Sequence, residues 1–290
     1  MSDAAIRRRP LSAVPHALDA FADLAAALGG RTPALFLDYD GTLTGIMPHP
    51  DDAVLSDSAR QLLRRVAEVL PVAVVSGRDR PNVERMVGID HLTYAGSHGF
   101  DVEVAGGEAV KSPVDGDWTE VLDKAEQQLR DGLADVAGSL VERKKFSIAA
   151  HYRGVAEEDY PAFRAVLDGA ARDFPDLKEK TGKKIFEFQP AIDWDKGRCV
   201  LWLLEALDLR RPDIAPLFLG DDVTDEDAFA ALQGTEGGLG IVCADAGDEP
   251  DRATAAAFRV DDPDQVLTLL ARLAGIDLPP PGSDDGEAPA

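Results

Sequence analysis

The chain has 290 residues, which is enough for one large or two modest domains with hydrophobic cores of their own. Its formal net charge of -23 at pH 7 argues against nucleic acid or an anionic membrane as the main partner, because both are polyanions. The two cysteines, Cys199 and Cys243, lie in apolar segments, and no stretch has the pattern of a membrane span or a secretory signal; we therefore expect no disulfide framework and a cytoplasmic location.

The N-terminal segment is predicted to be an arm followed by a helix. Residues 1–15 are polar and interrupted by prolines, the pattern of a mobile arm. Residues 16–28 carry apolar side chains at helical spacing up to a Gly-Gly pair, which predicts an amphipathic helix with a packing role.

The first motif that carries chemistry follows at residues 34–42, Ala-Leu-Phe-Leu-Asp-Tyr-Asp-Gly-Thr. The apolar run Ala34–Leu37 is typical of a strand buried on both faces, and it ends at two carboxylates, Asp38 and Asp40. Ligands of open α/β sheets bind outside the carboxyl ends of the strands, and paired carboxylates need a shared cation or proton. The motif indicates a Mg²⁺ or acid/base site, although two turn-forming Asp residues explain it equally well.

The same design returns after a helix predicted at residues 56–69. The apolar run Val72–Val75 ends in Ser76-Gly77-Arg78, whose hydroxyl, backbone N–H and guanidinium suit a phosphate oxygen. An ordinary turn with a helix cap is the alternative for this tripeptide.

Residues 93–100 predict a further strand end, which carries His98. A lone His is more often structural than functional. Residues 101–113, with two glycines at their centre, predict a hairpin.

A small α/β unit, built separately, is predicted between residues 118 and 190, where the order of elements changes. Its predicted elements are a helix at 118–136, a strand at 140–153, a helix at 157–174 and a strand at 183–189. Alternation along one strand at 140–153 puts Glu142 and Lys144 on one face, and Lys145, His151 and Arg153 on the other. Glu187 is predicted to point away from the face of the two Phe residues beside it. Such polar side chains could hold a polyhydroxy ligand, but a solvated strand face is the alternative.

The first pattern then reappears. Lys196 lies just before an apolar helix predicted at Cys199–Leu207. A cation at the start of a helix opposes the helix dipole, so either an anionic group lies nearby or the lysine is simply solvated. A third strand, Leu217–Leu219, ends in a cluster of Asp residues before a helix at 226–232, and Thr224 and Asp225 could cap that helix. The remaining predicted elements are strands at 239–243 and 258–260, a helix at 263–273 and a disordered acidic tail from residue 279.

Three strand ends therefore carry polar clusters: Asp38 with Asp40, Ser76 with Arg78, and Asp221 with Asp222. Right-handed crossovers place the carboxyl ends of parallel strands on one edge of a single sheet. We expect oxygen ligands for Mg²⁺, phosphate-oxygen donors and the Lys196 cation to meet at that edge.

These motifs resemble those of the haloacid dehalogenase superfamily of phosphohydrolases, at Asp38-Tyr-Asp-Gly-Thr42, Ser76, Lys196 and Gly220-Asp-Asp222. Within that superfamily the chain is similar to the trehalose-6-phosphate phosphatases through the segments at 76–78, 96–99, 142–153 and 220–229. The likeness runs from about Ala34 to about Val260. It implies an α/β fold with a Rossmann-like core, in which helices cover both faces of a parallel sheet, and an inserted smaller α/β cap.

The resemblance also implies roles for single residues. Asp38 would be the nucleophile that forms an aspartyl-phosphate, Asp40 the general acid and base, and Lys196 and Ser76 the remaining catalytic residues. The cofactor would be Mg²⁺, held by Asp38, Asp40 and Asp221. The residues that support phosphate or metal would be Thr42, Gly77, Arg78, Asp222 and Asp225. The residues that bind the sugar would be His98, Glu142, Lys144, Arg153 and Glu187, although alternation sets Arg153 on the wrong face, so that either the strand bulges or one assignment fails.

The implied domains are an N-terminal arm and helix at 1–30, a core at 31–103 and 190–275, a cap at 104–189 and a disordered tail at 276–290. The implied activity is Mg²⁺-dependent hydrolysis of trehalose 6-phosphate by a monomer, functionally coupled to trehalose-6-phosphate synthase. Alternatives on the same scaffold are a sucrose-phosphate or mannosyl-3-phosphoglycerate phosphatase, or a phosphosugar mutase. A non-catalytic phosphosugar-binding domain is a third possibility, which the presence of Asp38, Asp40, Lys196 and Asp221 disfavours.

Overall fold

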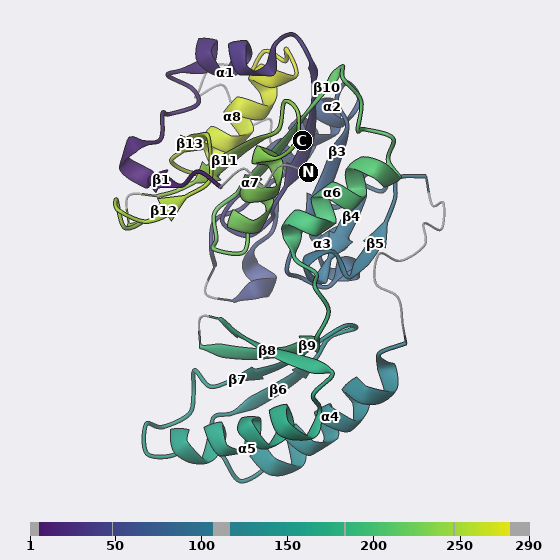
Figure 1. Cartoon of the computed structure of the whole chain (residues 1–290), viewed down its shortest axis with the longest axis vertical. Helices are drawn as coiled ribbons and strands as arrows, with labels where there is room; N and C mark the ends of the chain where they lie inside the picture. The colour runs from purple at the N-terminus through teal and green to yellow at the C-terminus, as the bar shows by residue number, and fades with distance from the viewer. Residues whose placement is uncertain (1–5, 48, 107–116, 183, 246, 279–290) are drawn as a thin grey trace, which may run out of the picture.

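The computed structural model describes residues 6–47, 49–106, 117–182, 184–245 and 247–278. A seven-stranded sheet forms the larger unit, in the order β13-β11-β10-β2-β3-β4-β5 (Figure 1). Neighbouring strands are parallel except β5, which pairs antiparallel with β4. The strands are β2 (Thr32–Leu37), β3 (Val72–Val75), β4 (Thr93–Gly96), β5 (Asp101–Glu103), β10 (Ile214–Gly220), β11 (Leu239–Cys243) and β13 (Phe258–Val260). The predicted α/β class with a parallel sheet is confirmed.

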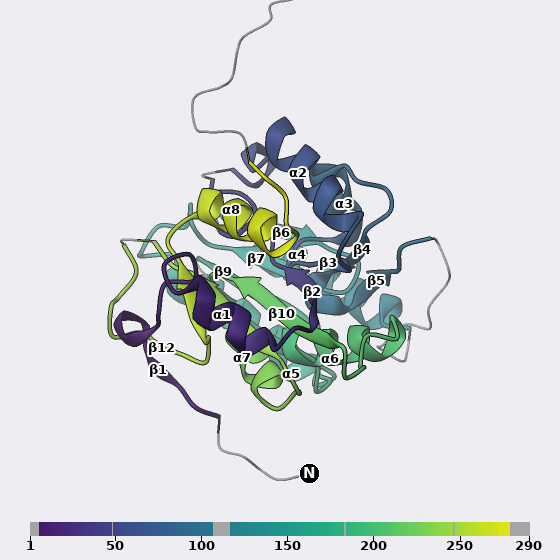
Figure 2. The ribbon, with the colours of Figure 1, turned by 90° about the horizontal axis from the view of Figure 1, so that it is seen from above.

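Helices cover both faces of this sheet (Figure 2). Leu35 and Leu37 of β2 pack in one cluster, with side chains of α1 (Phe21–Leu28), α2 (Asp57–Ala67), α3 (Arg80–Val87) and α8 (Pro263–Leu273). Ala34 and Phe36 point the other way, into a cluster with α6 (Lys196–Ala206) and α7 (Glu226–Gln233). Because both faces of β2 are covered, the strand is apolar up to Leu37, and the polar residues start where the cover ends.

The N-terminal segment belongs to the fold from residue 6. β1 (Arg9–Pro10) pairs antiparallel with β12 (Ala253–Thr254), and the 3-10 helix η1 (Leu11–Ala13) follows with Leu11 buried. The prediction of a mobile arm is therefore wrong for residues 6–15, because apolar side chains anchor them; residues 1–5 lie outside the described residues. The predicted helix at 16–28 forms only as α1, from Phe21.

A second sheet belongs to a separate α/β unit, which we call the inserted unit (residues 117–190). Its strands β6 (Leu140–Arg143), β7 (Ile148–His151), β9 (Ile185–Pro190) and β8 (Leu177–Gly182) lie in that order and are antiparallel. Helices α4 (Thr119–Leu133) and α5 (Tyr160–Asp173) cover one face, and the other face is turned toward the larger unit (Figure 1). The inserted unit has its own hydrophobic core, centred on Phe163, Phe186 and Phe188.

The structure corrects two predictions in this unit. The single strand predicted at 140–153 is a hairpin, β6–β7, and β8 was not predicted at all. Of the hairpin predicted at 101–113 only the first arm is described, as β5, which pairs with β4; its second arm, from residue 107, lies outside the described residues, as does the predicted tail from 279. The short 3-10 helices η2 (Pro50–Asp52) and η3 (Ser97–Gly99) complete the elements. None of the described helices is both long and apolar enough to cross a membrane.

Candidate active site

The carboxyl end of β2 and the start of α6 meet at a buried ion pair. Asp38 directly follows β2, and Lys196 is the first residue of α6, whose N-terminus is capped by the Asp195 side chain. The Lys196 Nζ lies 2.9 Å from Asp38 Oδ1 and 2.6 Å from Asp225 Oδ1, and the three side chains are at most 7% exposed. Burial lowers the pKa of Lys196, but the two carboxylates raise it further, so the net shift is upward and the ammonium stays charged.

Asp225 organises the loop after β10. Its Oδ1 accepts from Lys196, and its Oδ2 accepts from the backbone N–H groups of Asp221 and Asp222, at 2.9 Å each. The Asp225 side chain therefore does not cap α7, which was the alternative that the sequence left open. The Asp222 carboxylate is exposed and accepts from the backbone N–H of Val223, so Asp225, and not Asp222, holds Lys196 in place.

Three carboxylates form a group that could hold a metal ion. Asp38, Asp221 and Asp225 each offer an oxygen within 4.8 Å of the others. Gly41 permits the close approach of Asp221, because a Cβ at Gly41 would lie 2.2 Å from Asp221 Oδ2, and its φ of +81° also favours glycine.

The electrostatics of this group fit a divalent cation. Asp221 Oδ1 is buried and has no hydrogen-bond partner among the described residues. Burial and then the neighbouring Asp38 raise the pKa of Asp221 to about 9, and burial raises that of Asp38 to about 7 despite Lys196. Three carboxylates face one ammonium, and carboxylate oxygens are the ligands that Mg²⁺ prefers.

Asp40 lies beside this group but is bound elsewhere. The Arg78 Nε donates to Asp40 Oδ2 at 2.7 Å and the Arg78 Nη2 to Asp40 Oδ1 at 2.6 Å. The sequence predicts Asp40 as a metal ligand, but Arg78 binds both oxygens of its carboxylate, which lies outside the group of three. Asn82 Oδ1 accepts from Nη1 at 3.0 Å and fixes the guanidinium further.

The loop after β3 presents the groups that the sequence predicts for phosphate. Ser76 is 1% exposed, and its hydroxyl oxygen accepts from the backbone N–H of Arg78 at 3.1 Å. Gly77 lies against the His98 ring, since a Cβ at Gly77 would be 2.8 Å from His98 Cε1. Thr42, on the neighbouring loop, has a buried hydroxyl without a hydrogen-bond partner among the described residues.

His98 occupies a strained position between the two units. Its φ of 57° is in the left-handed region, and its backbone N–H donates to the Ser76 carbonyl at 2.9 Å. Burial lowers the pKa of His98 to about 3, and Lys196 adds to this effect, so the imidazole is neutral at physiological pH. The Glu187 carboxylate of the inserted unit is among the charges that act on it.

The inserted unit brings polar side chains to the face that looks toward the larger unit. The strand register sets Glu142, Ala149, Glu187 and Lys180 in one row. Phe186 and Phe188, the neighbours of Glu187, point into the helix-covered core, so this row lies on the opposite face.

Glu187 is the centre of this polar row. Its Oε1 lies 3.2 Å from Lys144 Nζ and accepts from the Ser147 hydroxyl at 2.5 Å. Burial raises the pKa of Glu187, but the Lys144 ammonium and the Ser147 hydroxyl are among the groups that lower it, and the net shift is downward, so the carboxylate stays charged. Glu142 binds His151 instead, at 2.9 Å.

Arg153 does not join the cluster of predicted sugar-binding residues. It lies in an exposed turn after β7, and no described contact connects it to Glu142, Lys144 or Glu187. The hairpin between β6 and β7 also removes the predicted conflict over faces, because alternation does not continue through the turn.

Two polar groups near this face were missed by the sequence analysis. Lys180 of β8 belongs to the same row, and burial and then Lys178 lower its pKa. Ser147 ends the turn between β6 and β7 and binds Glu187. Leu177 is the only apolar residue at the start of β8, so no alternation marks this strand in the sequence, and only knowledge of the strand order places Lys180 beside Glu187.

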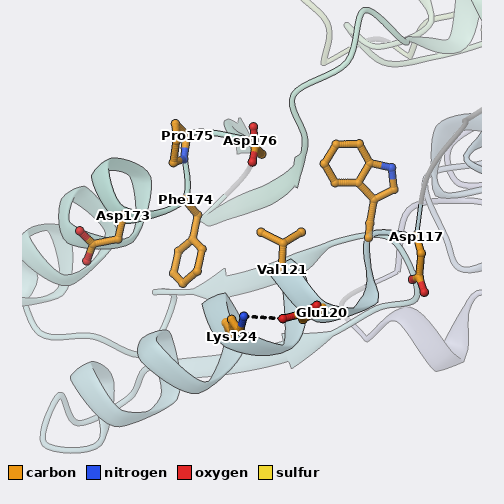
Figure 3. Close-up of a pocket in the computed structure, with 9 residues that line it drawn as sticks. Asp117, Glu120, Val121, Lys124, Asp173, Phe174, Pro175 and Asp176 are labelled. Atoms are coloured by element: carbon orange, nitrogen blue, oxygen red, sulfur yellow. Dashed lines mark hydrogen bonds and ion pairs between the residues drawn. The ribbon is translucent and has the colours of Figure 1, made fainter.

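A separate cavity of about 490 Å³ lies between the start of α4 and the chain after α5 (Figure 3). Its walls include Val121, Phe174 and Pro175, and its rim is acidic. None of the site residues predicted from the sequence lines it, so it is distinct from the chemistry at the strand ends.

A family model and a named relative point to the same protein family. A family model described as trehalose-phosphatase matches residues 36–264. A maize protein named trehalose 6-phosphate phosphatase is 38% identical over 273 residues, which cover 90% of this chain and 74% of that protein. A Mycobacterium tuberculosis protein named an uncharacterized glycosyl hydrolase is 41% identical over 272 residues, but the chain spans only 20% of its length.

Solved structures share the fold. The C-terminal domain of the Candida albicans trehalose-6-phosphate phosphatase aligns with a TM-score of 0.69 at 25% identity, over 90% of this chain and 99% of that one. A haloacid dehalogenase-like hydrolase of Bacteroides thetaiotaomicron aligns with a TM-score of 0.59 over 84% of this chain and 100% of that one, and at 15% identity it supports the fold alone.

Proposed function

The chain belongs to the trehalose-phosphatase family, and from that premise we propose that it hydrolyses trehalose 6-phosphate to trehalose and phosphate. It is a phosphatase, that is, a phosphoric monoester hydrolase. The observation that carries the proposal is the buried group of Asp38, Lys196, Asp221 and Asp225 at the carboxyl ends of two adjacent parallel strands.

The metal that fits this group is Mg²⁺, held by Asp38 and Asp221. Both Asp225 oxygens already accept hydrogen bonds, from Lys196 and from the Asp221 and Asp222 backbone N–H groups, so Asp225 positions the site. The orphaned Asp221 Oδ1 and the raised pKa of Asp221 support this assignment. When bound, Mg²⁺ would neutralise the carboxylates and the phosphoryl oxygens.

Asp38 is the nucleophile in this proposal. One of its carboxylate oxygens forms a bond to phosphorus while the bond from phosphorus to the sugar oxygen breaks, which leaves an aspartyl-phosphate. Lys196, 2.9 Å from Asp38, holds the carboxylate and offsets the charge that gathers around it. The Thr42 and Ser76 hydroxyls, both buried, supply donors for the phosphoryl oxygens in this proposal.

Asp40 transfers the protons. As an acid it protonates the departing sugar oxygen, and as a carboxylate it then takes a proton from the water that attacks the aspartyl-phosphate. Arg78 binds both oxygens of the Asp40 carboxylate, so one of them must leave Arg78 before Asp40 reaches the sugar oxygen.

The inserted unit recognises the sugar in this proposal and acts as a cap, with boundaries near residues 104 and 189. Glu187, Lys144 and His98 converge on the space between the units, and such charged and neutral hydrogen-bonding groups suit sugar hydroxyls. Glu142 lies in the same row as Glu187 and extends that surface.

The test is phosphate release from a panel of trehalose 6-phosphate, sucrose 6-phosphate, glucose 6-phosphate and mannosyl-3-phosphoglycerate, with Mg²⁺ and with a chelator. We expect Mg²⁺-dependent release from trehalose 6-phosphate, reduced at least about 10³-fold in Asp38→Asn. Asp213→Asn, an exposed carboxylate in an ion pair with Arg211, is the matched control and should leave turnover unchanged.

The outcomes separate the alternatives. Equal turnover of several sugars would keep the phosphatase and remove the sugar assignment. Tight binding of trehalose 6-phosphate without phosphate release would instead favour a binding domain and contradict the proposal.

A further inference from the structure

The tip of the β6–β7 hairpin is docked on the larger unit. Lys145 Nζ donates to Asp101 Oδ1 at 2.8 Å, which is the ion pair that joins the inserted unit to the larger unit among the described residues. The next side chain, Phe146, meets Phe100 with ring centroids 6.0 Å apart, and Phe100 is 2% exposed. One turn of the hairpin thus makes a polar and an apolar contact with the start of β5.

A third contact links the same tip to the loop after β3, which we call the phosphate loop (residues 76–79). Burial raises the pKa of Asp79; the Ser97 hydroxyl, which donates to Asp79 Oδ1 at 3.0 Å, and then the Lys144 ammonium and the Lys145 backbone N–H, lower it by less. Asp79 directly follows Arg78, and the Ser97 backbone N–H donates to the Arg78 carbonyl at 2.7 Å. The tip therefore rests on the two loops that position Arg78 and His98.

The same turn carries groups of the proposed sugar site. The Lys144 N–H donates to the Ser147 carbonyl at 2.8 Å and closes the turn, and both side chains bind Glu187. Where Lys145 is held, Lys144 and Ser147 are held as well, because they belong to one turn of four residues.

The ion pair between Lys145 and Asp101 can break at a small electrostatic cost. The Lys145 side chain is 56% exposed, so water solvates its ammonium readily when the contact breaks. Asp101 is 10% exposed, but the Arg80 Nε lies 3.4 Å from its other oxygen, so the carboxylate keeps a cation without Lys145. Separation therefore leaves no isolated charge in the interior, which would be the main cost of opening a buried pair.

We propose that Lys145 and Phe146 are positioning residues that latch the inserted unit onto Asp101 and Phe100 and so set Lys144, Ser147 and Glu187 over the phosphate loop. The proposal rests on the proposed function for its substrate, a sugar phosphate. The latch acts on sugar recognition and not on the reaction at Asp38, so a phosphate ester too small to reach the inserted unit does not depend on it.

The first experiment compares Lys145→Met with Lys184→Met, a matched exposed lysine of the inserted unit that lies over the Tyr152 ring and not at the larger unit. For trehalose 6-phosphate we expect a KM raised about twofold to fivefold in Lys145→Met, with a smaller change in kcat, and no change in Lys184→Met. For p-nitrophenyl phosphate we expect no loss in either variant. Equal effects of both variants, or an equal loss on both substrates, would overturn the latch.

A double-mutant cycle and salt test the pairing itself. Asp101→Asn alone should raise KM, and Lys145→Met added to it should have little further effect, because the two act through one contact. Raising NaCl from about 0.05 to about 0.5 M should raise KM in the wild type more than in Lys145→Met, since salt screens an exposed pair. Additive effects, or identical salt dependence, would contradict the pairing.

Hydrogen exchange tests the latch without any substrate. Amides of residues 144–147 and 97–101 should exchange faster in Lys145→Met than in the wild type or Lys184→Met. This readout stands even when no sugar phosphate is turned over, so failure of the proposed function and failure of the latch are told apart. Unchanged exchange at both segments would show that Lys145 does not hold the tip.

Discussion

Arg78 binds both carboxylate oxygens of Asp40, through Nε at 2.7 Å and Nη2 at 2.6 Å. Two parallel N–H donors fix the plane of the carboxylate as well as its position. The side chain that would move protons is therefore oriented by the loop after β3, while the proposed nucleophile Asp38 is oriented by Lys196 and Asp225. The two Asp residues are two positions apart but have separate electrostatic supports.

The first prediction concerns Arg78→Lys. A lysine offers one point charge in place of a fork, so Asp40 loses its fixed orientation. We expect kcat for trehalose 6-phosphate to fall about 10- to 100-fold, and by less for p-nitrophenyl phosphate, whose leaving group needs no proton. Steady-state kinetics on both substrates measures the difference.

Asp40→Asn provides the control for this assignment. In the Asp40→Asn background, Arg78→Lys should cost little more, because the partner that it orients has lost its function. Independent, fully additive losses would mean that Arg78 does not act through Asp40 and only binds the phosphate group of the substrate.

The second prediction concerns the stability role of Asp225. In Asp225→Asn one amide nitrogen must face either Lys196 or the backbone N–H groups of Asp221 and Asp222, so a buried donor meets a donor. We expect the free energy of unfolding to fall by about 3–5 kcal/mol, measured by urea denaturation. Asp222→Asn, an exposed change in the same loop, should stay within about 0.5 kcal/mol; a similar loss in both variants would refute the special role of Asp225.

The sequence predicts the strand ends well, because a parallel strand covered on both faces must be apolar until its cover ends. β2 and β3 begin or end within two residues of their predicted limits, and the polar residues directly after them do meet. The resemblance adds the identity of the residues that matter, and the structure brings Asp38, Lys196 and Asp221 together as expected.

The inserted unit is harder to predict, for physical reasons. The turn at Lys144-Lys-Phe-Ser147 contains none of the Gly, Pro, Asn or Asp residues that mark turns, so one long strand was the natural interpretation. β8 is a polar edge strand, and its only apolar signal is Leu177 at its start. Asp225, one of the two carboxylate partners of Lys196, is 29 residues away in the chain, and no local pattern selects Asp225 over Asp222.

The third prediction concerns Lys180, which the sequence analysis missed. Its ammonium is partly buried, and no described carboxylate forms an ion pair with it, so its pKa is lowered by burial and then by Lys178. Lys180→Met should therefore leave the free energy of unfolding unchanged or slightly higher.

The same variant should weaken sugar binding. We expect KM for trehalose 6-phosphate to rise about tenfold, the worth of one hydrogen bond to a charged group, with p-nitrophenyl phosphate unaffected. Lys184→Met, exposed in the same unit, serves as the comparison. An unchanged KM in Lys180→Met would place the ammonium outside the sugar site.

The last prediction concerns the pH dependence of stability through His98. The folded-state pKa of His98 is lowered from 6.5 to about 3, by burial first and by Lys196 second. Between these two values the unfolded chain binds a proton that the folded chain does not, so the stabilising effect of the neutral ring is present above pH 6.5 and is lost as pH falls. From about pH 6.5 to about pH 5 this contributes a loss of up to about 2 kcal/mol.

His98→Gln replaces the ring with a group that does not titrate. The free energy of unfolding of the variant, from urea denaturation at several pH values, should therefore fall less steeply on acidification than that of the wild type. His91→Gln, an exposed histidine seven residues earlier, should keep the steep wild-type dependence. Parallel curves for wild type and His98→Gln would mean that the His98 imidazole is protonated in the folded chain as easily as in water, and that it does not face the sugar as a neutral donor and acceptor.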